Sequence, residues 1–187
     1  METTDIKPNK IAFQSALAYS LYSILLIYVL YFMGVDMNKA DLSTGTKVIT
    51  WLLSYLPFLG AIMYAQKYHR DEQLGGSISF GRAFSTGFRV SLISGLIIGV
   101  FMVLYYKVLN TNAFDAVMNA TEEAMLNNPS MGDSQRETAM SMTRNWFGPM
   151  ALVGTIIGMA IVGSILSLIG AAILKKEAPV FIDEVED

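Results

Sequence analysis

The sequence predicts an all-α integral membrane protein: four transmembrane helices in two hairpins, with an amphipathic helical hairpin between the third and fourth spans. Of its 187 residues, 53% are hydrophobic and only 16% are charged, whereas soluble domains carry about 25% charged residues. The charges are also unevenly placed, because four long segments contain none: 11–35, 48–66, 90–106 and 145–174. A helix needs about 20 mostly apolar residues to cross the hydrocarbon core. Helix is the expected form there, because lipid offers the backbone no hydrogen-bond partner.

We place the spans at about 11–34, 48–68, 85–108 and 149–173 of a single membrane domain, 1–187. The third span reaches the required length only if its helix begins near Phe84 and includes Arg89. The second contains Pro57, which removes one backbone hydrogen bond and predicts a kink.

The distribution of Lys and Arg predicts which side the termini occupy. Four spans put both termini and the 69–84 loop on one side, with eight Lys and Arg residues, against five on the other. Lys and Arg accumulate in cytoplasmic loops. We therefore expect a multi-pass inner-membrane protein with both termini in the cytoplasm.

Small residues recur at helical spacing in two spans and predict where helices pack. The third span has Gly87, Ser91, Gly95 and Gly99, and the fourth contains Gly154 and Gly158, followed by further small residues. Lipid supplies no hydrophobic drive for helix association, so close backbone approach must supply the contact. We expect spans three and four to cross tightly along these ridges, within one chain or between copies.

Residues 75–84, GGSISFGRAF, could cradle a phosphate or turn the chain back into the membrane. A phosphate loop of the usual type needs a Lys followed by a hydroxyl, and this stretch has neither arrangement. A turn explains more: Gly75 and Gly76 allow positive φ, and Ser77 or Ser79 can cap the next helix. Arg82 suits the headgroup layer. Arg89, two turns further on, either reaches the headgroups or binds an anion; Gln14, Tyr19 and Tyr22 are alternative partners.

Three strings carry a resemblance to a known family: ISFGRAFSTGF (78–88), YHRDE (68–72) and AAILKKE (171–177). The chain resembles, over nearly its whole length, the domain of unknown function 4199 family, small four-span inner-membrane proteins typical of the Bacteroidota. The resemblance implies a four-helix membrane fold. It implies no activity and carries over no catalytic residue.

The segment 112–147 between the last two spans predicts a pair of amphipathic helices. Asn112 is the expected cap of the first, and Asn127-Asn128-Pro129 ends it. Ser134 and Glu137 match a capping box for the second. These helices either extend spans three and four or cap the bundle, and Gly148-Pro149 predicts a break or kink before the last span. The acidic end, 177–187, reads as a mobile tail.

The sequence contains no pattern that predicts catalysis, a cofactor or a metal site. Cysteine is absent, and the single histidine, His69, lies in a charged run and is expected to be a solvated loop residue. A net charge of −3 gives no support for a nucleic-acid partner. We therefore expect a non-enzymatic accessory, scaffold or envelope protein. Its partners would be the bilayer and a protein or second copy, bound through spans three and four or the 112–147 hairpin. A small transporter or channel subunit is the alternative, and a lipid-acting enzyme comes third.

Overall fold

The computed structural model describes residues 6–35 and 42–176 and is built of helices. The long helices are α1 (Asn9–Phe32), α2 (Thr44–Tyr68), α3 (Phe80–Leu104) and α5 (Asp133–Leu174). A shorter helix, α4 (Thr111–Leu126), precedes α5, and single π-helical turns, η1 (His69–Gln73) and η2 (Tyr105–Leu109), prolong α2 and α3. Within the described ranges, pairing of extended chain is limited to one bridge between Ile78 and Lys176.

Four helices are long and apolar enough to cross a membrane, which confirms the predicted fold class. They are Asn9–Phe32, Thr44–Gln73, Phe80–Leu109 and Asp133–Leu174, counting the π-helical turns with the helices that they prolong. Each is mostly unburied within the protein, as expected of helices whose outer faces contact lipid. The protein is therefore a multi-pass membrane protein.

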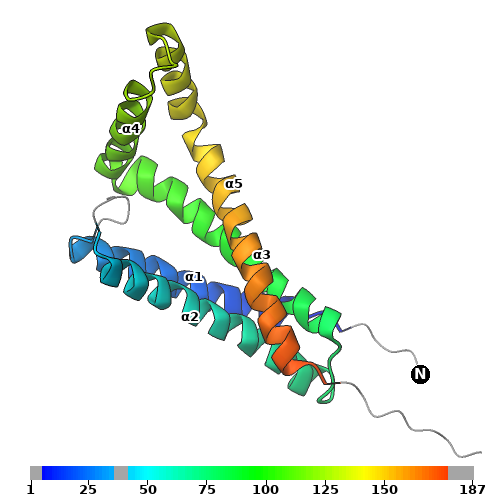
Figure 1. Ribbon diagram of the computed structural model, residues 1–187. Helices are drawn as coiled ribbons and strands as arrows, with labels where there is room; N and C mark the ends of the chain where they lie inside the picture. Colours follow the sequence, from blue (N-terminus) through cyan, green and yellow to red (C-terminus); the bar gives the residue numbers. More distant parts are fainter. Residues whose placement is uncertain (1–5, 36–41, 177–187) are drawn as a thin grey trace, which may run out of the picture.

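The bundle is organised around α2 and α3, each of which packs against both α1 and α5. The contact between α3 and α5 is the most extensive, and these two helices cross over the α1–α2 pair (Figure 1). The core consists of apolar side chains from three helices, among them Ala12 and Ala16 of α1, Phe58 and Ile62 of α2, and Val90 of α3. Phe58 also stacks on Tyr19, with ring centroids 4.5 Å apart.

The predicted hairpin between the last two spans is formed by α4 and the amino-terminal part of α5, which project beyond the bundle (Figure 1). Of the two alternatives for its second helix, extension of span four is the one observed, because α5 is a single helix of 42 residues. The pair Gly148-Pro149 therefore does not break the helix. A proline removes only one backbone hydrogen bond, and α5 has several turns on either side of it.

The helix starts of the hairpin differ from the sequence prediction. Asn110, rather than Asn112, caps α4: its Oδ1 accepts a hydrogen bond from the backbone N–H of Ala113 at 3.1 Å. The cap comes earlier because η2 ends at Leu109, and the next residue, Asn110, has a non-helical φ of −143°. Ser134 lies inside α5, and Gln135 Oε1 accepts from the Gly132 N–H instead. The predicted end of α4 before Asn127 is confirmed. The predicted tail 177–187 lies outside the described residues.

Candidate functional site

A buried glutamine joins three helices near the end of the bundle where the described chain begins and ends. Gln66 of α2 is fully buried. Its side-chain Nε2 donates to the backbone carbonyl of Ala83 in α3 and to that of Ser167 in α5, each at 3.0 Å. Because these carbonyls belong to two helices, one side chain connects α2 to both.

Two glycines make room for the Gln66 amide. A Cβ added at Gly87 of α3 would lie 2.8 Å from Gln66 Nε2, and one added at Gly170 of α5 would overlap Gln66 Oε1. Contacts this short are essentially never made by real Cβ atoms. A side chain at either position would therefore displace the Gln66 amide, and at Gly87 it would also meet Ser167 and Ile62.

Several polar groups surround this crossing. Thr86 and Ser91 donate to carbonyls one turn earlier in α3. Within the described residues, the buried Gln66 Oε1 and Ser167 Oγ have no hydrogen-bond partner. An unpartnered buried polar atom costs about 1–3 kcal/mol, so the close helix packing at Gly87 and Gly170 must offset that cost.

His69 is fully buried, which corrects the prediction that it lies in a solvated loop. The helical path of α2 continues into η1, so His69 follows Ile62 and Gln66 on the inward face at spacings of four and three residues. Its Nδ1 is hydrogen-bonded to Gln73 Oε1. The spacing from Phe58 through Ile62 and Gln66 to His69 was the signal in the sequence that could have placed it.

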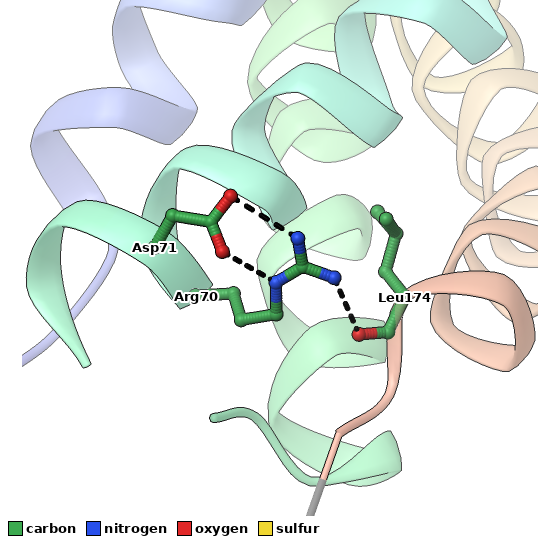
Figure 2. A network of polar contacts seen from close by, with 3 residues as sticks. All are labelled: Arg70, Asp71 and Leu174. Carbon is green, nitrogen blue, oxygen red and sulfur yellow. Dashed lines mark hydrogen bonds and ion pairs between the residues drawn. The ribbon is translucent and has the colours of Figure 1, made fainter. Parts of the chain in front are cut away.

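Arg70 fastens the end of α5 to the end of α2. Its Nε and Nη2 bind the carboxylate of Asp71 at 2.6 and 3.1 Å, and its Nη1 donates to the carbonyl of Leu174 at 3.2 Å (Figure 2). Leu174 is the last residue of α5, where carbonyls lack partners within the helix. Arg70 therefore supplies one such carbonyl with a charged donor.

The 75–84 stretch forms a turn, as one of its two interpretations predicted. Gly75 and Gly76 have φ of 67° and 90°, values that favour glycine. Of the two candidate serines, Ser79 caps α3, accepting from the Arg82 N–H at 3.4 Å. Ile78 exchanges two backbone hydrogen bonds with Lys176, at 2.8 and 2.9 Å. The loop is thus paired with the chain just beyond α5.

Arg82 and Arg89 both reach the amino-terminal segment. Arg82 Nη2 donates to the Ile6 carbonyl at 2.8 Å, and Arg89 Nη1 donates to Asn9 Oδ1 at 2.7 Å. The partner of Arg89 is therefore Asn9 instead of the predicted Gln14, Tyr19 or Tyr22. Since α1 begins at Asn9, Arg89 lies level with the start of α1, although it is two turns inside α3.

The glycine ridge of α3 faces other helices. A Cβ at Gly95 would lie 3.1 Å from Ile156 Cα, and one at Gly99 would lie 3.2 Å from the Leu152 carbonyl oxygen. Ser91 is buried against Gly163, where an added Cβ would overlap its side chain.

Gly154 and Gly158 take no part in this crossing within the chain, which corrects that part of the prediction. Both are exposed, and no atom lies within 4 Å of a Cβ added at either position. The face of α5 that contacts α3 carries Leu152, Ile156, Met159 and Gly163 instead. These residues recur every three or four positions, and Gly154 and Gly158 fall between them on the opposite side of the helix.

The hairpin contains a cleft of about 360 Å³ between α4 and α5. Three carboxylates, two arginines, two methionines and a leucine line it: Glu122, Asp133, Glu137, Arg136, Arg144, Met125, Met140 and Leu126. Arg136 and Asp133 form an ion pair at 3.2 Å. Phe114 and Phe147 pack edge to face, with centroids 5.0 Å apart, where α4 approaches α5 near the bundle.

These features differ in what they can do. The Gln66 crossing is buried, and both it and the Arg70 contacts hold helices together. The hairpin cleft and the Arg89 corner are open to partners. In the part of the chain that the structure describes, no group of three or more His, Cys, Asp or Glu residues is placed to hold a metal ion.

Comparison with known proteins identifies the family that the chain matches. The model of a family described as protein of unknown function (DUF4199) matches residues 14–176. No curated protein and no solved structure matches the chain.

Proposed function

The chain belongs to the DUF4199 family, and we propose that it is a non-enzymatic accessory or scaffold protein of the inner membrane that holds a protein partner through its projecting hairpin. The continuity of α5 carries this proposal. A helix of 42 residues is about 63 Å long at 1.5 Å per residue, whereas the hydrocarbon core is about 30 Å thick. The part of α5 that exceeds the thickness of the core belongs to the hairpin.

The surface of the hairpin suits a protein segment. Its cleft combines charges of both signs with two methionines, and flexible methionine side chains adapt to different partners. Met142 and Trp146, one turn apart on α5, are each 62% exposed. Aromatic residues and methionine are enriched at protein interfaces.

The distribution of cations supports the proposed orientation. On the predicted topology, eight Lys and Arg residues fall on the side of the termini and five fall on the side of the hairpin. This excess favours termini in the cytoplasm. The hairpin would then stand on the outer side of the inner membrane, where its partner would be a membrane-bound or envelope protein.

Site-specific crosslinking in cells tests the proposal. A photoreactive residue in place of Leu126, which lines the cleft, should give a discrete crosslinked protein that mass spectrometry identifies. The same residue in place of the exposed Ile165 of the apolar part of α5 should not give that product. A product containing two copies of this chain would identify the partner as a second copy.

A charge reversal provides the matched control. Glu122→Lys changes the lining of the cleft and should reduce the crosslink, whereas Glu123→Lys changes the neighbouring exposed residue outside the lining and should not. Equal yields from both variants, or no protein product at Leu126, would contradict the proposal. Solute flux through vesicles containing only this protein would favour the transporter alternative.

A further inference from the structure

Arg89 is a cation that lies level with the start of α1, and its partner there, Asn9, carries no charge. Its Nη1 donates to the Asn9 side-chain oxygen. The ion pairs found in the described ranges involve Arg70 and Arg136, not Arg89. A guanidinium at the edge of an apolar layer is costly without a counter-charge, so this position calls for an anion.

Among the described residues, Arg89 donates to the neutral Asn9 side chain, and further donors lie beside it. A guanidinium has five N–H donors and no acceptor atom, and one of these donors is used by Asn9. Because Asn9 Oδ1 accepts that bond, the Nδ2 of the same amide is left as a further donor beside the guanidinium. Lys10, the next residue of α1, is exposed, as is Asn9. The first turns of α1 and α3 contain no acidic residue.

An apolar track continues from this corner into the membrane. Phe13 lies one turn beyond Asn9 in α1, and Leu96 lies two turns beyond Arg89 in α3; each is 51% exposed. The helices α1 and α3 contact each other both here, through Arg89 and Asn9, and further along, where Tyr28 packs on Phe101. A free phosphate would use only the polar corner, whereas a phospholipid would also cover this track.

We propose that Arg89, Asn9 and Lys10 form a binding site for the phosphate group of an anionic phospholipid, whose acyl chains lie along Phe13 and Leu96. Arginine binds phosphate oxygens through paired N–H donors, and Asn9 holds the guanidinium in place for that contact. The site is separate from the hairpin and does not depend on the function proposed for it.

Asn9→Asp is the most discriminating variant. It places a carboxylate against the guanidinium, which satisfies Arg89 and adds an acidic residue at the start of α1, where it favours the helix. We therefore expect unchanged or higher thermal stability, but binding of phosphatidylglycerol weakened about tenfold or more, as expected for loss of charge-assisted hydrogen bonds. Native mass spectrometry of the full chain in detergent, titrated with phosphatidylglycerol, measures both free and bound forms.

Asn119→Asp is the control, because it makes the same charge change at an exposed position of α4. It should leave phosphatidylglycerol binding unchanged. Arg89→Gln, an independent variant, should weaken that binding as Asn9→Asp does, but without a gain in stability.

Three results would overturn the proposal. The first is unchanged phosphatidylglycerol binding by Asn9→Asp and Arg89→Gln. The second is an equal loss in Asn119→Asp, which would indicate net charge alone. The third is equal binding of phosphatidylcholine, or displacement of phosphatidylglycerol by millimolar inorganic phosphate, since either would rule out an anionic lipid as the specific ligand.

Discussion

At the scale of single residues, Gln66 has the largest structural role among the polar side chains described. It is fully buried and donates two hydrogen bonds to two different helices. Its amide occupies space that a Cβ at position 87 or 170 would overlap. Hydrogen bonds between membrane helices are modest individually, on the order of 0.6–2 kcal/mol, so the fit around the amide matters as much as the bonds.

The first prediction tests this fit. Gly170→Ala should lower the free energy of unfolding by about 1–3 kcal/mol, the usual cost of overpacking, because the new Cβ would overlap Gln66 Oε1. Denaturation in mixed detergent micelles provides the measurement. Gly154→Ala is the matched control, since its Cβ would enter open space, and it should not destabilise the protein.

The clash has a specific partner, so a double-mutant cycle can identify it. In a Gln66→Ala background, Gly170→Ala should cost less than in the original chain, with a coupling energy of about 0.5–3 kcal/mol. Independent, additive effects of the two substitutions would show that Gln66 is not what excludes a side chain at position 170.

At the scale of elements, the crossing of α3 and α5 is the main contact of the fold. The α3 ridge was identifiable from sequence because Gly87, Ser91, Gly95 and Gly99 repeat every four residues. The matching face of α5 was not, because it mixes Leu152, Ile156 and Met159 with Gly163. A ridge of small residues accepts large side chains from its partner, so small residues alone do not reveal both faces of a contact.

Substituting glycines on the two helices should therefore have opposite results. Gly95→Leu should destabilise the protein by about 1–3 kcal/mol or more, because a Cβ there already lies 3.1 Å from backbone of α5. Gly158→Leu should be neutral or slightly stabilising, since its surroundings are open and leucine favours helix over glycine by almost 1 kcal/mol. Thermal melting in detergent compares them. A damaging Gly158→Leu would indicate a contact between copies.

The elements also show where sequence reasoning succeeds and where it stops. The spans and the 75–76 turn were predictable, because each is determined by residues next to one another in the sequence: the charge-free runs and the pair Gly75-Gly76. The burial of His69 and the pairing of Arg89 with Asn9 were not predictable. The first depends on how far α2 continues, and the second depends on where α1 begins relative to α3. Of the candidate site, the residue types were therefore visible in the sequence, but their partners required the packed bundle.

At the scale of the whole molecule, the described chain begins and ends at one end of the bundle, and the hairpin projects from the other (Figure 1). Arg70 and the Ile78–Lys176 bridge hold the end of α5 to the α2–α3 connection. These polar contacts join separate helices at the end with the termini, whereas α4 contacts α5 at the hairpin end through the packing of Phe114 on Phe147.

This arrangement predicts the labelling pattern of single cysteines, which the cysteine-free chain makes simple to read. In spheroplasts, a membrane-impermeant maleimide should label Ser130→Cys in the hairpin. It should label Lys7→Cys and Lys175→Cys only after lysis, because four crossings put both on the same side, which the proposed orientation assigns to the cytoplasm. Different behaviour of positions 7 and 175 would contradict an even number of crossings.

The unbroken course of α5 makes the hairpin a lever. The last contact of α5 with α3 toward the hairpin is near Gly148, where an added Cβ would lie 3.7 Å from Val103. From there to its first residue α5 rises about 22 Å, so tilting that part by about 5° would move the tip by about 2 Å. A partner bound at the tip would therefore tilt the membrane part of α5 when it moves the tip. In the other direction, a change in the tilt of α5 within the bilayer would displace the tip.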